Sequence, residues 1–103
     1  MSEEVAYDFE WDAEKAFSNT RKHGVTFERA ATVFLDLLAL TVFDVEHSQH
    51  EERWFTLGLD ANGALLAVAH SFEATTPERI RVRLISARSA TRREQQFYED
   101  EPR

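Results

Sequence analysis

The sequence contains no cysteine, and only three glycines and two prolines occur among its 103 residues. A small domain without disulfides is typical of a reducing compartment, so we expect a cytoplasmic protein. Three glycines are too few for a glycine-rich phosphate loop, and no serine or cysteine nucleophile motif is present. These absences argue against nucleotide-dependent enzymes and ordinary hydrolases.

Long hydrophobic runs are also missing. No apolar stretch approaches the roughly 20 residues of a membrane span, and the acidic start MSEEVAYD lacks the apolar core of a signal peptide. We therefore expect no membrane segment. Hydrophobic residues make up 43% of the chain, which is enough for one modest core. The length predicts a single domain over residues 1–103, with an acidic extension at 1–8 and an acidic tail at 99–103.

Charge is distributed unevenly along this chain, whose formal net charge is −7. Residues 79–93 contain six arginines and no acid, whereas residues 1–14 contain six acids and no base. A basic patch of this size can attract phosphate even on an acidic protein. It can equally be a solvated strand face paired with neighbouring acids, each pair contributing about 0–1 kcal/mol. Composition alone favours neither interpretation.

Three helices are predicted by their terminal residues. Asp12 can cap a helix that ends at Gly24, and Thr26 can cap a second helix with an apolar stripe from Phe27. Thr91 and Glu94 form a capping-box pattern before a short C-terminal helix.

Strand patterns fill the rest of the chain. They lie at Phe9–Trp11, Leu38–Phe43, Arg53–Leu59, Leu65–Phe72 and from Arg79 to about Ala87. We expect loops at Asp44–Glu52 and Glu73–Glu78, and a tight turn at Asn62-Gly63. The order predicts an α+β fold, with two N-terminal helices and a C-terminal helix packed on one face of a roughly four-stranded antiparallel sheet. The other face would then be free for a site.

The last predicted strand carries a regular arginine pattern. Arg79, Arg81 and Arg83 alternate with apolar residues and therefore share one face. The consecutive apolar residues Leu84 and Ile85 interrupt the alternation, which predicts a bulge. A guanidinium group matches phosphate oxygens and stays charged, so this face could hold a nucleic-acid backbone.

The four histidines allow different roles. His23 follows Lys22 at a helix end, where it either complements the helix dipole or moves protons beside a phosphate-stabilising lysine. His70 lies among apolar residues and is expected to be partly buried and hydrogen-bonded. His47 and His50 are two histidines in a polar loop, which is a weak metal signal, and we predict no metal and no cofactor.

Three segments, taken together and in order, carry a family resemblance. FEWDAEKAFSNTRKHGVTFERAATVFLD, ERWFTLGL and RLISARSATRRE resemble the BrnT family of toxins from bacterial type II toxin–antitoxin pairs. The resemblance implies a RelE-like fold, cleavage of RNA and slowed translation. It also implies a BrnA-like antitoxin partner, with DNA bound only indirectly through the antitoxin complex.

The resemblance also suggests which residues carry the chemistry. In a metal-independent reaction the RNA 2′-hydroxyl attacks the adjacent phosphorus, which requires a base, an acid and cations near the phosphoryl oxygens. We expect His23 or Glu52 to move protons and Arg53, Arg83 and Arg88 to hold phosphate. The expected RNA contacts are Lys22, Arg81, Arg92 and Arg93. The alternative is a non-catalytic binding module, or an inactive toxin homologue, whose arginine face docks an acidic partner. The antitoxin is expected to cover that face.

Overall fold

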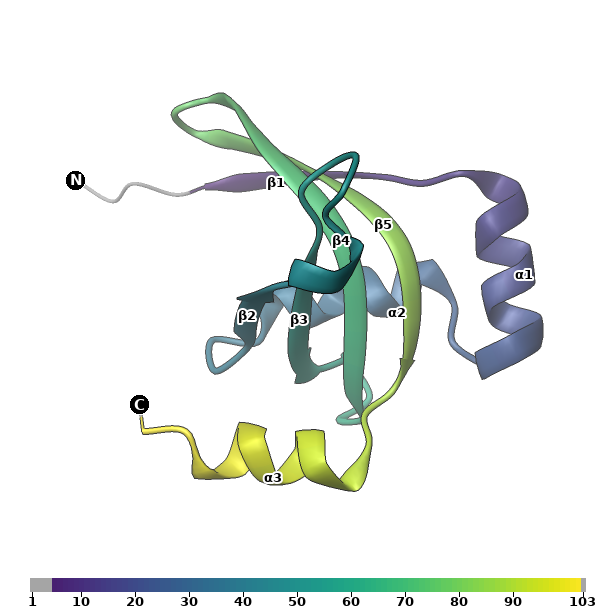
Figure 1. The fold of residues 1–103 in the computed structure, drawn as a ribbon, viewed down its shortest axis with the longest axis vertical. Helices are drawn as coiled ribbons and strands as arrows, with labels where there is room; N and C mark the ends of the chain where they lie inside the picture. Colours follow the sequence, from purple (N-terminus) through teal and green to yellow (C-terminus); the bar gives the residue numbers. More distant parts are fainter. Residues whose placement is uncertain (1–4, 103) are drawn as a thin grey trace.

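The computed structural model describes residues 5–102, so the start of the expected acidic extension (1–4) and the last residue of the tail lie outside the described part. Five strands, three α-helices and two short 3-10 helices form the described chain (Figure 1). In chain order they are β1 (Ala6–Glu10), α1 (Ala13–His23), α2 (Phe27–Thr32), η1 (Val33–Leu35), β2 (Leu40–Phe43), η2 (Val45–His47), β3 (Trp54–Leu59), β4 (Leu65–Thr76), β5 (Arg79–Ser89) and α3 (Arg92–Asp100). No helix in the described part is long and apolar enough to cross a membrane.

The helix ends lie where the capping residues predict them. The Asp12 side chain accepts a hydrogen bond from the Glu14 N–H, and Gly24 ends α1 with a left-handed φ of 69°. Thr26 caps α2 through the Arg29 N–H. Thr91 and Glu94 form both hydrogen bonds of the predicted capping box at the start of α3. These local signals therefore fixed the helix boundaries.

The sheet differs from the prediction of roughly four antiparallel strands. It has five strands in the order β1-β5-β4-β3-β2, and it is mixed. β2, β3, β4 and β5 are antiparallel, whereas β1 pairs parallel to β5, from Ala6 opposite Arg79 to Glu10 opposite Arg83. Part of the expected acidic extension, residues 6–8, thus belongs to an edge strand. The parallel pairing was missed because it joins segments from opposite ends of the chain.

The β4–β5 hairpin corrects a second prediction. The expected loop at Glu73–Glu78 is wrong, because β4 continues to Thr76 and only Pro77 and Glu78 form the turn. Pro77 lies in the turn itself, where it interrupts no ladder hydrogen bond. The predicted bulge is confirmed, since Ala69 is opposite Ser86 while His70 is opposite Leu84. The extra residue in β5 is Ile85.

Helices pack on both faces of the sheet, which corrects the expectation that all three helices share one face. Phe27 and Val33, from the α2 and η1 segment, pack with Leu66 and other apolar residues of β4 and β5 in the main core. A second cluster joins Ala67 of β4 to Tyr98 of α3. Because consecutive strand residues point to opposite faces, α3 lies on the other side. Strand alternation does not reveal which side a terminal helix will take.

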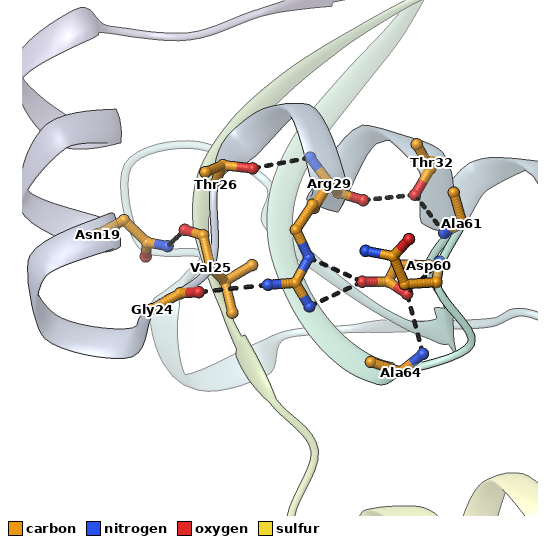
Figure 2. Close-up of polar contacts among 10 residues, drawn as sticks. Asn19, Gly24, Val25, Thr26, Arg29, Thr32, Asp60, Ala61 and Ala64 are labelled. Carbon is orange, nitrogen blue, oxygen red and sulfur yellow. Dashed lines mark hydrogen bonds and ion pairs between the residues drawn. The ribbon is translucent and has the colours of Figure 1, made fainter.

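Asn19 connects helix α1 to the sheet. Its side chain is 5% exposed. The amide nitrogen donates to the carbonyl oxygens of Val25 at 2.9 Å and Ala87 at 2.8 Å, and the amide oxygen accepts from the Ala87 N–H at 3.0 Å. The contact with Val25 is visible in Figure 2. The amide thereby satisfies backbone groups of β5 beyond the part of the strand that pairs with β1.

We expect Asn19→Ala to lower the free energy of unfolding by about 2 to 4 kcal/mol, because it leaves both Ala87 backbone groups without their partner and removes one hydrogen bond to the Val25 carbonyl. Urea unfolding followed by circular dichroism measures the change. Ser18→Ala, a substitution at the neighbouring exposed position of the same helix, is the control and should change it by less than about 0.5 kcal/mol. Equal stability of the two variants would contradict this role.

His70 is confirmed as a buried, hydrogen-bonded histidine. Its side chain is 1% exposed, and its Nε2 atom lies 2.7 Å from the Thr56 hydroxyl, which in turn lies 2.8 Å from the Thr41 hydroxyl. The ring of Phe34 packs edge-on against it. Burial lowers the pKa of His70 to about 4, so the imidazole is neutral in the folded protein at neutral pH.

The lowered pKa of His70 predicts a loss of stability in mild acid. The unfolded chain, with an ordinary imidazole, binds a proton at higher pH than the folded chain does. Stability therefore falls as pH drops from about 6.5 to about 4, by about 3 kcal/mol in total. Urea unfolding across this range should show a shallower fall for His70→Gln than for wild type. Parallel curves would contradict the assignment, since the acids that titrate in both proteins cancel in the comparison.

Candidate nucleic-acid interface

The arginine row of β5 lies on the face of the sheet turned away from α1 and α2. Its members alternate with Ile80, Val82 and Leu84, the last two of which are buried in the main core. Cross-strand partners on the same face are Glu73 opposite Arg81 and Ser71 opposite Arg83. α3 packs on one end of this face, and Glu51 and Glu52, from the segment between β2 and β3, lie near its arginines.

Most of these arginines are already paired with acids. Arg79 forms two hydrogen bonds with the Asp8 carboxylate, and these hold the pKa of Asp8 below its usual value. Arg81 donates to Glu73 at 2.7 Å. Arg79 and Arg81 therefore fit the second interpretation of the charge run, in which the strand face is paired with neighbouring acids. Phosphate at either position would have to compete with a carboxylate.

Arg83 differs from its neighbours, because it forms no ion pair with any described residue. It is exposed and lines a surface hollow of about 310 Å³. The same hollow is lined by Arg81 and Glu52 from the predicted site, and by Glu10, Ser71 and Glu73. The structure thus brings together a free guanidinium, a second arginine and several carboxylates.

Arg88, near the end of β5, is held by Glu94 in the first turn of α3. Its Nη1 and Nη2 atoms donate to the two carboxylate oxygens of Glu94 at 2.7 and 3.0 Å, and Glu94 also accepts from the Thr91 N–H. The hydrogen bond with Arg88 lowers the pKa of Glu94 against the opposing effect of burial, and the same bond raises the pKa of Arg88. One carboxylate therefore both caps the helix and orients the arginine.

Arg53 lies beside the first hollow but lines another one, of about 390 Å³, together with His47 and His50. Its Nε atom is buried, lies 3.7 Å from the Glu51 carboxylate and has no hydrogen-bond partner. His47 instead contacts the Asp44 carboxylate through Nδ1 at 2.9 Å. Within residues 5–102 no group of three or more histidines and carboxylates is arranged to hold a metal ion.

The remaining predicted residues lie elsewhere. Lys22 and His23, at the end of α1, line a third hollow of about 210 Å³ beside Ile85 and Ser86 of β5. Arg92 and Arg93 are exposed in the first turn of α3. Of the predicted residues, Glu52, Arg81 and Arg83 line the first hollow, and Lys22 and His23 line the third one.

Sequence reasoning missed four polar residues of the first hollow, Glu10, Glu51, Ser71 and Glu73. A signal for the first was present, because Asp8 and Glu10 alternate with Tyr7 and Phe9 just as the arginines alternate with apolar residues. Only the parallel pairing of β1 with β5 places those acids beside the arginine row. Glu73 was not expected on a strand, because the segment Glu73–Glu78 was predicted to be a loop, whereas β4 continues to Thr76.

The shared role of Glu94 predicts a measurable, salt-dependent contribution to stability. Glu94→Gln keeps a capping side chain but removes the charge, and we expect it to lower the free energy of unfolding by about 1 kcal/mol. The loss should shrink in 1 M salt and below the lowered pKa of Glu94, where wild type also loses the charge. Urea unfolding tests this, with Glu99→Gln on the same helix as the control. An equal loss of unfolding free energy in both variants would show that the Arg88–Glu94 pair contributes nothing to stability.

The family model described as the ribonuclease toxin BrnT of type II toxin–antitoxin systems matches residues 11–94. The crystal structure of the ribonuclease toxin BrnT from Brucella abortus is similar, with a TM-score of 0.55 and 24% sequence identity over 85% of this chain and 100% of that one. No curated protein sequence matches. At this identity the similarity to the solved structure concerns the fold.

Proposed function

The chain belongs to the BrnT family of ribonuclease toxins of type II toxin–antitoxin systems, and from that premise we propose that it is a metal-independent endoribonuclease that slows translation by cutting RNA. The observation that carries this proposal is the free Arg83 guanidinium beside Glu52 in an open hollow of the sheet. An unpaired guanidinium can accept a phosphate without first losing a carboxylate.

The proposed reaction uses the RNA 2′-hydroxyl as the nucleophile. Glu52 takes the proton from this hydroxyl, whose oxygen attacks the adjacent phosphorus and forms a cyclic phosphate. Arg83 stabilises the negative charge that builds on the phosphoryl oxygens. The leaving 5′-oxygen takes its proton from water, which has access to the hollow. The shared hollow supports Glu52 as the base in preference to His23, which lines a different hollow.

The other predicted residues are proposed to bind RNA beyond the reacting phosphate. Arg81 and Arg88 are held by Glu73 and Glu94, so a phosphate there competes with a carboxylate. Arg53 lies in the adjacent hollow. Four exposed basic residues, Lys22, His23, Arg92 and Arg93, would contact the RNA backbone farther along. Binding is therefore expected to weaken steeply with salt.

A type II system implies a protein antitoxin as partner. We propose that this partner is BrnA-like and that DNA is bound only by the complex, through the antitoxin. The described helices support this assignment, because most of the described lysines and arginines are on β5 or at helix ends and no described helix presents a row of basic residues for a major groove.

Substitution of the hollow residues tests the ribonuclease proposal. We expect Arg83→Ala and Glu52→Gln each to lower the rate of RNA cleavage about 100-fold, since each removes an interaction with the transition state. Arg79→Ala, which removes an arginine already paired with Asp8, is the matched control and should stay within about twofold of wild type. Purified protein and end-labelled RNA in the presence of EDTA give the rates.

Other outcomes of the same assay distinguish the alternatives. Loss of wild-type cleavage on chelation would indicate a metal-dependent reaction, with His47 and His50 as the candidate metal ligands. No cleavage with or without EDTA, together with tight binding of a protein partner, would favour a non-catalytic binding module. In cells, equal growth arrest by wild type and by Arg83→Ala combined with Arg88→Ala would contradict the arginine mechanism.

A further inference from the structure

Exposed apolar side chains are concentrated on one short segment, residues 35–45, which we name the β2 rim. Twelve large hydrophobic side chains of the described chain are exposed, and the β2 rim contains six of them: Leu35, Leu37, Leu38, Val42, Phe43 and Val45. Leu37 is 99% exposed, and Leu35 and Val45 are each 77% exposed. A contiguous apolar segment of this kind is typical of an interaction surface.

The same segment contains an unprotected sheet edge. β2 is the outermost strand on its side of the sheet (Figure 1). Its sequence, LTVF, has no charge and no proline, which are the residues that usually protect an edge strand. The Asp44 N–H donates to the Arg53 carbonyl at 2.8 Å, so by antiparallel alternation the backbone groups of Thr41 and Phe43 point away from β3. These groups can accept an added strand.

The β2 rim is held in a fixed shape. The Asp36 carboxylate accepts hydrogen bonds from the Leu38 N–H at 2.9 Å and from the Leu59 N–H at 2.8 Å. The Tyr98 hydroxyl donates to the same carboxylate, which ties the segment to α3. The leucines on either side of Asp36 are therefore presented to solvent by a structured loop, and binding a partner would require little further ordering.

Charge indicates what kind of partner fits. No lysine or arginine occurs between Arg29 and Arg53, whereas the same interval contains five acids: Asp36, Asp44, Glu46, Glu51 and Glu52. A second copy of the chain would bring a net charge of −7 and the same acidic segment to this surface. Complementarity therefore favours a segment that is both apolar and basic.

We propose that the β2 rim anchors a basic, strand-forming segment of the antitoxin, which adds to the free edge of β2. This assignment of partner rests on the proposed function. It differs from the expectation that the antitoxin recognises the arginine face, because that face already holds acids of its own chain. Within the sheet β3 and β4 separate β2 from β5. A segment bound at β2 therefore does not occupy the Arg83 hollow, which another part of the antitoxin could contact.

The test measures the affinity of the purified chain for the product of the reading frame adjacent to its gene, by isothermal titration calorimetry. We expect Val42→Lys to raise the dissociation constant at least tenfold, and Val42→Glu to raise it by a smaller factor, because the partner segment is basic. Val5→Lys is the matched control, since Val5 is 45% exposed and Val42 is 44% exposed, and it precedes the opposite edge strand. This control should bind within twofold of wild type.

Each other result overturns a stated part of the proposal. Equal affinities for Val42→Lys and Val5→Lys would exclude the β2 edge, and weaker binding by Val42→Glu than by Val42→Lys would exclude a basic partner. No binding of that product to wild type would exclude it as the partner. A concentration-dependent dimer of the chain alone, abolished by Val42→Lys, would make a second copy the occupant.

RNA cleavage by the same proteins separates this proposal from the proposed function. Val42→Lys should cleave RNA as wild type does, because Val42 lies outside the hollow. If wild type cleaves no RNA but its binding depends on Val42 as expected, the docking surface stands and the ribonuclease proposal fails. If wild type cleaves RNA but binding ignores Val42, the docking proposal fails and the ribonuclease proposal stands.

Discussion

The position of the arginine face depends on which groups form hydrogen bonds with the outer backbone edge of β5. The Asn19 amide is one of these groups. β1 pairs with β5 only as far as Arg83, and the strand then bulges at Ile85. Beyond the bulge, the two Ala87 backbone groups bond to Asn19 of α1 instead of to another strand. A helix side chain thereby forms the hydrogen bonds with β5 that a longer β1 would otherwise form. It sets the position of α1, and with it Lys22 and His23, relative to the arginine row.

Acids of the same chain neutralise part of the positive charge of the arginine face. Asp8, Glu73 and Glu94 each hold one arginine, so half of the six arginines that the sequence concentrates in residues 79–93 are already paired. Arg83 forms no such pair with any described residue, although Glu10 and Glu52 line its hollow. Under the proposed function, a phosphate would bind first where no carboxylate must be displaced. The acids would then limit unselective binding of RNA to the rest of the face.

Two surfaces of opposite character lie on different strands of one sheet. β5 and its neighbours present arginines and carboxylates around an open hollow, which suits a charged, extended substrate. β2 presents apolar side chains, free backbone groups and an acidic surrounding, which suits a basic protein segment. Because a sheet edge and a sheet face bind by different means, backbone pairing and side-chain contact, one small domain can serve both a substrate and a partner.

The sequence by itself determined the features that depend on near neighbours. The caps at Asp12, Thr26 and Thr91, the bulge after Leu84 and the burial of His70 follow from local hydrogen bonding and from alternation. Tertiary structure alone decided that β1 joins β5 in parallel, that α3 takes the second face and that Glu10 and Glu73 lie among the arginines. Those features depend on pairings between distant segments, which no local pattern specifies. The arginine row was therefore visible in the sequence, but which of its members is free to bind phosphate was not.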